Sequence, residues 1–493
     1  MLRKLGFAYF IFCCVFLLGS CSGSGEPSSS TGSNFGNEEY IETENPDSES
    51  CLETSCFYFS YDDSASTAAA EIVKYSVLND IVPDNALGRA YEFLNYEKFD
   101  NSNQTNIGLF DVSMGVWTHS GESESSPLIH ELGIHLSSPV ISKEERKNTV
   151  LTILVDVSGS MSTNFLNLPI DVEPGIKTRL DVVKYGLSAL YKEGLKEGDV
   201  INIVQFESNS TKEDILLEAW SYSEADSKFS DTVSSLITLG STNLDAGITR
   251  AYEVATRNYD SNKVNRVVIL TDAFANTGET DPAIISQNTR INNQEGIYFS
   301  GIGVGVGFND AFLDELTDAG KGAYFSVITP RDSARVFTDK FVSLLNVAAI
   351  NVQFRLDYPP ELTHVSTASE EQSSNKSEVQ TTNFSYNTSQ YFLEGFEAPS
   401  SDDALSTPIK LTITYENSQG DEFTEIHSMA LEDIEGFDLN NIKDAYLIST
   451  LANLVAEKKT CEAATSEIDT LLSAYESELA TEYRDLIVKF CNK

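Results

Sequence analysis

One segment of this 493-residue chain has polar residues of the types and spacing that a chemical site requires. It is Asp156-Val157-Ser158-Gly159-Ser160-Met161. The segment directly follows an apolar run, so the carboxylate of Asp156 is expected at the end of a strand. Ser158 and Ser160 lie two residues apart on the following turn and can present both hydroxyls to one ion, while Gly159 permits a tight backbone. Carboxylate and hydroxyl oxygens with retained water favour Mg²⁺, with Mn²⁺ or Ca²⁺ as alternatives. The segment is therefore predicted to hold a divalent metal.

A second polar segment resembles a zinc-protease motif only superficially. His130-Glu131-Leu132-Gly133-Ile134-His135 separates its histidines by one residue more than the H-E-x-x-H spacing, which puts two imidazoles on one helical face. The segment is predicted to be a strand, and a separation of five residues on a strand puts the two rings on opposite faces. Catalytic zinc is therefore not expected there.

Other enzyme motifs are missing from the sequence. We find no G-x-S-x-G nucleophile elbow and no phosphate-binding loop. Gly301-Ile302-Gly303-Val304-Gly305 follows an apolar run but lacks the full dinucleotide-binding spacing. No nucleotide is therefore expected, and the chain is predicted not to be an enzyme.

Apolar strands alternate with helical stretches around the candidate metal segment. The expected strands are Thr149–Val155, Val200–Phe206, Arg266–Leu270 and Ile297–Val304, and the expected helices are residues 178–193, 225–237, 244–258, 281–294 and 309–319. Such alternation predicts an α/β fold with a parallel, doubly wound, Rossmann-like sheet and helices on both faces. Ligands collect at the carboxyl ends of the strands in these sheets, where Asp156 is expected.

The D-x-S-x-S pattern resembles the metal-ion-dependent adhesion site of von Willebrand factor A domains. Gly240-Ser241-Thr242-Asn243-Leu244 resembles the loop of that family whose threonine reaches the metal, and Leu270-Thr271-Asp272 resembles the loop that supplies a second aspartate. The resemblance implies a set of metal ligands that consists of Asp156, Ser158, Ser160, Thr242 and Asp272. It also implies that an acidic side chain of a protein partner completes the coordination of the metal, which is binding without bond-breaking.

Two features next to the predicted site depart from the family. Ala273 stands directly after the last aspartate, where the family usually has glycine. Asn164 to Gly175, with Asp171 and Glu173, looks like an insertion before the first helix. This 164–175 insertion is expected to overhang the metal face, where it either shapes the choice of partner or is a passive surface loop.

The resemblance extends to bacterial YfbK-like lipoproteins that contain von Willebrand factor A domains. The landmarks in Phe57 to Asp100 are Phe59-Ser60, Asp63-Ser64-Ala65-Ser66, Pro83 and Glu92-Phe93-Leu94-Asn95-Tyr96. The stretch from Gly133 to Glu145 and the helical tail also resemble the flanks of that family. The resemblance thus covers nearly the whole mature chain.

The first residues are typical of a secretion signal. Arg3 and Lys4 precede the apolar stretch Phe7 to Leu18, which is shorter than the roughly 20 residues of a membrane span. Leu18-Gly19-Ser20-Cys21 resembles the lipobox of bacterial lipoproteins, which implies cleavage before Cys21 and acylation of its thiol, with palmitate among the acyl chains. We expect an extracytoplasmic, lipid-anchored protein of the cell envelope. Serine after Cys21 favours the outer membrane if the organism has one.

Four cysteines remain once Cys13 and Cys14 leave with the signal and Cys21 is acylated. An even number of cysteines in an oxidising compartment suggests two disulfides, and four cysteines allow three pairings. Proximity in the sequence favours the pairings Cys51–Cys56 and Cys461–Cys491.

Composition and periodicity divide the chain into six parts. They are a signal peptide (1–20), a flexible tether (21–55), a helical segment with β strands (56–147), the von Willebrand factor A domain (148–345), an antiparallel β domain (346–435) and a C-terminal helical hairpin (436–493). Strands within 105–142 would complete the β domain, which would make the central domain an insertion.

The formal net charge of -42 narrows the classes of partner. Binding to nucleic acid is not expected, because it requires a positively charged surface. The negative charge also repels an anionic membrane surface, so membrane contact is expected only through the lipid anchor. The predicted function is metal-dependent binding of a protein partner with an exposed Asp or Glu. One alternative is a structural envelope scaffold or assembly factor in which the metal only stabilises the fold, and another is a metal-dependent hydrolase.

Overall fold

The computed structural model describes the chain from residue 51 onward, with gaps. The described residues are 51, 55–61, 67–99, 105–120, 127–163, 175–208, 212–273, 279, 296–305, 308–320, 322–398, 406, 408–417, 419–472 and 475–492. They all belong to one compact unit, which extends from Ser48 to Lys493. Residues 1–50, which contain Cys21, the predicted signal and most of the predicted tether, lie outside the described residues, as do residues 164–174 of the predicted insertion and the predicted helix 281–294.

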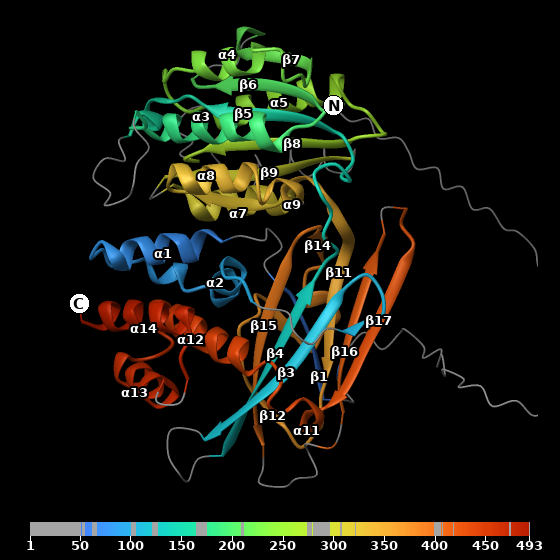
Figure 1. Cartoon of the computed structure of the whole chain (residues 1–493), viewed down its shortest axis with the longest axis vertical. Helices are drawn as coiled ribbons and strands as arrows, with labels where there is room; N and C mark the ends of the chain where they lie inside the picture. Colours follow the sequence, from blue (N-terminus) through green and yellow to red (C-terminus); the bar gives the residue numbers. More distant parts are fainter. Residues whose placement is uncertain are drawn as a thin grey trace, which may run out of the picture. The chain divides into compact units, whose positions relative to one another are not determined.

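The central domain is built on a six-stranded sheet (Figure 1). In spatial order its strands are β10 (Tyr324–Val327), β9 (Ile297–Val304), β8 (Val264–Thr271), β5 (Thr149–Asp156), β6 (Val200–Phe206) and β7 (Ile215–Ser221). Neighbouring strands are parallel except β7, which is antiparallel to β6. Strand β5 is buried along its whole length, as expected for a nearly continuous apolar run that is covered on both faces. The prediction of a doubly wound α/β sheet is confirmed.

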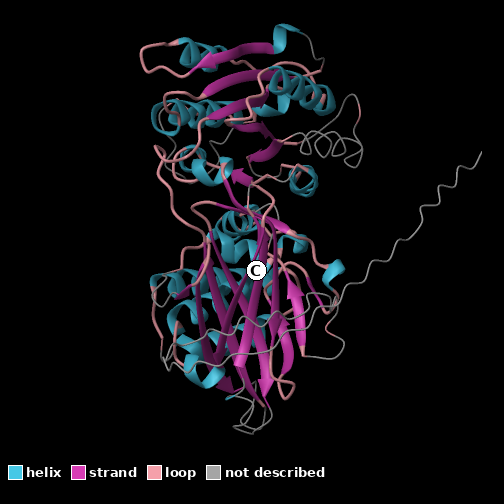
Figure 2. Cartoon of the chain, turned by 90° about the vertical axis from the view of Figure 1, so that its right-hand side faces the viewer, coloured by secondary structure: helices cyan, strands magenta, loops and turns pink. Residues whose placement is uncertain are grey.

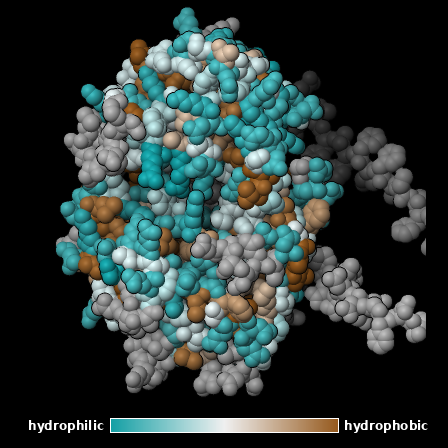
Figure 3. Space-filling view, viewed as in Figure 1, coloured by the Kyte–Doolittle hydropathy of each residue, from teal (hydrophilic) through white to brown (hydrophobic). Residues whose placement is uncertain are grey.

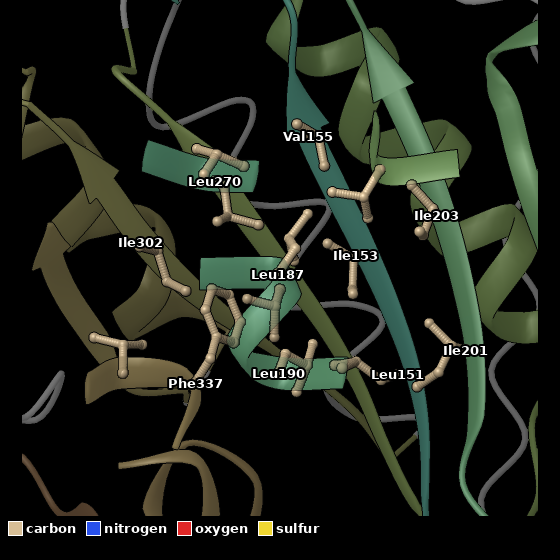
Figure 4. Close-up of a cluster of buried hydrophobic side chains, with 14 of the residues drawn as sticks. Leu151, Ile153, Val155, Leu187, Leu190, Ile201, Ile203, Leu270, Ile302 and Phe337 are labelled. Atoms are coloured by element: carbon tan, nitrogen blue, oxygen red, sulfur yellow. The ribbon is translucent and has the colours of Figure 1, made fainter. Parts of the chain in front are cut away.

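Helices cover both faces of this sheet. Along β5 the odd-numbered side chains, such as Leu151 and Ile153, pack against Leu187 and Phe337 (Figure 4), whereas Leu154 points to the opposite face, where it packs with Ile248. The helices of the first face are α3 (Arg179–Ala189), α4 (Lys228–Ser235), α8 (Pro330–Phe337) and α9 (Phe341–Leu345). The helices of the second face are α5 (Leu244–Arg257) and α7 (Asp310–Ala319). Short helical turns η2 (Gly159–Ser162), η3 (Leu190–Gly194) and η4 (Lys212–Asp214) lie between these elements.

Two antiparallel sheets form the β domain (Figure 2). One contains β12 (Thr363–Thr367), β15 (Ser389–Ala398), β4 (Leu128–Ser137), β3 (Asp111–Ser120) and β2 (Thr105–Asn106). The other contains β13 (Gln372–Ser373), β1 (Cys56–Phe59), β11 (Val347–Asp357), β16 (Pro408–Glu416) and β17 (Glu422–Ala430), with β14 (Thr382–Ser385) paired to β11 and η5 (Lys376–Glu378) between β13 and β14. Phe59, Phe354 and Phe392 belong to the core between the sheets. Strands from before and after the central domain share both sheets, so the central domain interrupts the β domain in sequence.

A layer of helices packs on β3, β4 and β15. The helices described in this part of the chain are α1 (Ala68–Leu78), η1 (Asn85–Leu87), α2 (Ala90–Tyr96), α11 (Leu431–Ile434), α12 (Leu439–Val455), α13 (Cys461–Leu472) and α14 (Glu478–Cys491). The tail thus has three long helices, and the predicted two-helix hairpin is wrong. The apolar pattern continues through this region and so predicts one helix. The Ser477 side chain accepts a hydrogen bond from Ala480 N–H and caps the start of a separate helix, α14.

Both expected cysteine pairings are present. Cys51 is bonded to Cys56, and Cys461 at the start of α13 is bonded to Cys491 at the end of α14. No helix in the described part of the chain is long and apolar enough to cross a lipid bilayer.

Candidate metal centre

Three segments that are far apart in the sequence meet at one end of the central sheet. Asp156 is the last residue of β5, and Asp272 directly follows β8, the parallel neighbour of β5. The hydroxyl of Thr271 donates a hydrogen bond of 2.6 Å to Oδ2 of Asp156, which joins the two strand ends. Thr242 lies just before α5, in a loop whose Gly240 carbonyl accepts a hydrogen bond from Gly159 N–H at 3.1 Å. The carboxyl ends of β5 and β8 therefore gather the predicted ligand segments.

The first aspartate is held in place by hydrogen bonds to both of its oxygens. Asp156 is fully buried, and its Oδ1 accepts a hydrogen bond of 2.8 Å from the backbone N–H of Ser158, while Oδ2 is bonded to Thr271. The hydroxyl oxygens of Ser158 and Ser160 lie 3.0 Å apart. This arrangement fixes one carboxylate and two hydroxyls close together on one tight turn.

The surroundings of Asp156 make its charged form less favourable than in water. Burial and the nearby carboxylate of Asp272 raise the pKa of Asp156, hydrogen bonds from Thr271 and Ser158 lower it, and the net result is a pKa of about 6. Two buried carboxylates that repel one another are stabilised by a cation between them.

The second aspartate has one satisfied oxygen and one unsatisfied oxygen. Asp272 is fully buried, and its Oδ2 accepts a hydrogen bond of 2.5 Å from Nη1 of Arg179. Its Oδ1 has no hydrogen-bond partner among the residues that the structure describes. A buried, unpaired carboxylate oxygen is costly unless something else binds it. A divalent cation fits this centre, because the remaining donors are oxygens of the kind that Mg²⁺ and Mn²⁺ prefer.

The threonine loop is clamped against the segment that follows β6. Thr242 is buried, and the neighbouring N–H groups of Ser241 and Asn243 donate hydrogen bonds to the hydroxyl of Ser208 and the carbonyl of Glu207. Gly240 has φ +33°, and a Cβ at this position would lie 1.9 Å from Oε2 of Glu207. The positive φ therefore favours glycine at this position, and a larger residue would also displace the Glu207 side chain.

Two residues that the sequence did not mark as functional contact the predicted ligands. Thr271 orients Asp156, and its only sequence signal is its place directly before Asp272. Arg179 pairs with Asp272 and is the first residue of α3, whose start is fixed by the capping box of Thr178 and Asp181. That box predicts where the helix begins but not where the arginine side chain points.

The residue after the second aspartate adopts an unusual backbone conformation. Ala273 is fully buried with φ +57°, in the left-handed region that favours glycine. Its N–H donates a hydrogen bond of 2.9 Å to the hydroxyl of Thr271. The departure from the family at this position thus leaves the loop strained but does not remove a ligand.

The two histidines of the superficial zinc motif lie on opposite faces of β4. His130 Nδ1 lies 2.8 Å from the hydroxyl of Thr118. His135 packs beside Phe99 and Tyr391 among the helices, where burial lowers its pKa to about 4. No group of three or more His, Cys, Asp or Glu side chains suited to a metal was found in the described ranges. The candidate centre at β5 and β8 differs from such a cluster, because hydroxyls make up most of its donors.

Comparison with known proteins identifies the central domain. Residues 151–275 match the family described as von Willebrand factor type A domain. The chain is 29% identical over 218 residues to the uncharacterized protein YfbK of Escherichia coli strain K12, a match that covers 44% of this chain and 35% of YfbK. It is 27% identical over 273 residues to inter alpha-trypsin inhibitor heavy chain 4 of Mus musculus, which covers 54% of this chain and 25% of that protein. The chain thus spans about a third or less of the length of these relatives.

Solved structures of such domains are also similar to this chain. A von Willebrand factor type A protein from Catenulispora acidiphila is 12% identical with a TM-score of 0.41, and the match covers 80% of this chain and 98% of that one. Proximal thread matrix protein 1 from the mussel byssus, in a structure with a zinc-occupied MIDAS motif, is 20% identical with a TM-score of 0.31 over 43% of this chain and 47% of that one. The family match and the bacterial relative support the identification of this chain as a bacterial, YfbK-like protein with a von Willebrand factor type A domain.

Proposed function

We propose that this protein is a lipid-anchored component of the cell envelope that binds a protein partner through a divalent metal. Asp156, Ser158, Ser160, Thr242 and Asp272 would hold the metal, for which Mg²⁺ is favoured, and an Asp or Glu of the partner would complete its coordination. The observation that carries the proposal is the pair of buried carboxylates at the ends of β5 and β8, of which Asp272 Oδ1 lacks a hydrogen-bond partner in the described part of the chain.

The roles of the residues follow from their contacts. Thr271 and the N–H of Ser158 hold Asp156 in one orientation, and Arg179 holds Asp272 in another, so the two carboxylates are preorganised before a cation arrives. The serine hydroxyls add neutral donors that leave positive charge on the cation. The bound metal would supply an electrophilic position for a carboxylate of the partner.

Binding fits this centre better than catalysis does. Von Willebrand factor type A domains are interaction modules, and the match to that family covers all five proposed ligands. Both oxygens of Asp156 are engaged by hydrogen bonds, so this carboxylate is a positioned ligand rather than an available general base.

The Arg179–Asp272 ion pair argues against a metal that only stabilises the fold. Arg179 already compensates one of the two buried carboxylates, so the domain has a cation at the centre without a metal. We therefore expect the Asp156→Ala variant to unfold cooperatively near the temperature of the wild type. A variant that fails to fold would instead favour a structural role for the metal.

A capture experiment with the full-length chain tests the proposal. Partners from a cell-envelope extract should be retained in Mg²⁺ and released by EDTA, and Asp156→Ala should capture none of them. Asp485→Ala is the matched control, because Asp485 is exposed on α14 and contacts Arg484 there. Partners that are retained in EDTA and by Asp156→Ala would overturn the proposal.

The lipid anchor is a separate part of the proposal and has its own test. Cys21 in Leu18-Gly19-Ser20-Cys21 should take up labelled palmitate when the chain is produced in a bacterial host. Cys21→Ser should remain unlabelled and leave the membrane fraction. Equal labelling of the wild type and Cys21→Ser would refute the anchor.

A further inference from the structure

We propose that Arg179 is a built-in counter-charge of the metal centre, which weakens metal binding and keeps the metal-bound centre net positive. The inference rests on the proposed metal site but not on the identity of any partner. It assigns a role to a residue that lies outside the set of five proposed ligands.

The backbone fixes the position of Arg179 from two sides. Its N–H donates a hydrogen bond of 3.1 Å to the carbonyl of Thr163, at the end of the turn that carries Ser158 and Ser160. The capping box between Thr178 and Asp181 fixes the first turn of α3, so the Arg179 side chain extends from the first residue of the helix. Its side chain is 10% exposed and reaches Asp272 from this anchored start.

A second buried arginine in the same domain shows what a purely structural ion pair looks like. Arg146 contacts both oxygens of Asp199, at 3.0 Å and 2.5 Å. The same two oxygens also accept hydrogen bonds from the N–H groups of Thr149 and Lys196. Every oxygen of that carboxylate is therefore satisfied within the protein.

The pair at the metal centre differs from that pattern in one respect. Arg179 engages Oδ2 of Asp272, and Oδ1 is left buried without a partner among the described residues. A side chain that served only to neutralise Asp272 would gain more by satisfying both oxygens. The arginine instead holds the carboxylate by one edge and leaves the other edge for a ligand.

The relevant charge is the sum over these three side chains. Above the pKa of Asp156, the two aspartates carry two negative charges and Arg179 carries one positive charge, so a divalent cation changes the sum over the three from -1 to +1. Without Arg179 the corresponding sum with the metal bound would be zero. The guanidinium therefore opposes the metal by repulsion and leaves the metal-bound centre selective for anions.

Titration of the full-length chain with Mn²⁺ at pH 8, without any partner, tests this role. Arg179→Gln removes the charge and keeps a hydrogen-bond donor, and it should bind Mn²⁺ about tenfold more tightly than the wild type, or ~1.4 kcal/mol. Arg179→Lys keeps the charge and should stay within about threefold of the wild type, or ~0.65 kcal/mol. Equal or weaker binding by Arg179→Gln overturns the proposal, as does the absence of Mn²⁺ binding in both the wild type and this variant.

A structural measurement on the wild type covers the case in which Arg179→Gln does not fold. In crystals of the full-length chain with Mg²⁺, Nη1 of Arg179 should remain on Oδ2 of Asp272 while the metal lies on the Oδ1 side. A guanidinium that leaves Asp272 when Mg²⁺ is present would show that it only substitutes for the metal. Neither measurement involves a partner, so either can fail while the capture experiment succeeds.

Discussion

At the scale of single residues, the two aspartates of the centre have different tasks. Asp156 uses both of its oxygens within the protein, whereas Asp272 uses one and leaves the other unpaired. The sequence predicted both residues because each lies at the end of an apolar run, in a segment that resembles a known loop. It could not predict the difference between them, because that depends on Thr271 and Arg179, whose side-chain directions are set by tertiary packing.

Ala273 provides a prediction about local strain. A non-glycine residue in the left-handed region costs about 1–2 kcal/mol, which exceeds the roughly 0.5–1 kcal/mol of backbone entropy that glycine costs. Ala273→Gly should therefore raise the free energy of unfolding, by up to about 1 kcal/mol. The measurement is chemical denaturation of both proteins in EDTA.

Ala251 provides the matched control for this variant. It is buried in the middle of α5, where Ala→Gly should lower the free energy of unfolding by about 1 kcal/mol or more. A loss of similar size in Ala273→Gly and Ala251→Gly would show that position 273 is not strained.

At the scale of elements, the strands that form the centre of the sheet were the easiest to predict. β6 and β9 have the predicted bounds, because a run of apolar residues that is buried on both faces has an unambiguous pattern. The edge strand β7 was missed, because Ala219 has φ +50° and its register against β6 is irregular, which breaks the alternation. The edge strand β10 is only four residues long, which is too short for a clear pattern.

The disulfide between α13 and α14 gives a prediction at this scale. Cys461 and Cys491 are separated by 30 residues, and a loop of that length restricts the unfolded chain enough to stabilise the fold by about 3–4 kcal/mol. The double variant Cys461→Ser/Cys491→Ser should lose stability of that order in thermal unfolding.

The other disulfide serves as the comparison. Cys51 and Cys56 are only five residues apart, so the corresponding double variant should lose less, about 2 kcal/mol. A larger loss from the short loop than from the long one would contradict the chain-entropy explanation.

At the scale of the whole molecule, the described unit joins the central domain to the helical layer through α1. Thr67, which directly precedes α1, and Glu71 of α1 line a small cavity together with Ser326 of β10 and Arg335 and Lys340 from the α8–α9 region. The Ser326 hydroxyl donates a hydrogen bond to the Glu71 carboxylate. Polar residues cover most of the visible face of the molecule (Figure 3), in keeping with the net charge of -42.

Glu71 gives a prediction about pH. Part of its side chain is accessible, but the carboxyl group lies in the cavity, where burial and the nearby Asp332 raise its pKa from 4.5 to about 8. Because the folded-state pKa is raised, the stability from the neutral carboxyl is fully present below about pH 4.5 and is lost as the pH rises to about 8. The melting temperature of the wild type should therefore fall relative to Glu71→Gln across this window.

The comparison with Glu71→Gln removes the contribution of groups that titrate independently of Glu71. Burial lowers the pKa of Lys340 to about 8, and this residue is present in both proteins, so its effect cancels in the difference. The measurement is thermal unfolding of both proteins between pH 5 and pH 9. A constant difference in melting temperature over that range would contradict the assignment to Glu71.

The central claim is that oxygens from three segments hold one divalent metal at the ends of β5 and β8. Anomalous diffraction from crystals of the full-length chain grown with Mn²⁺ tests it most directly. We predict a single strong peak within coordination distance of Asp272 Oδ1 and of the hydroxyls of Ser158, Ser160 and Thr242, either directly or through a bound water, and no such peak in crystals of Asp156→Ala. A Mn²⁺-soaked wild-type crystal without density at this position, or with the ion bound only elsewhere, would contradict the account.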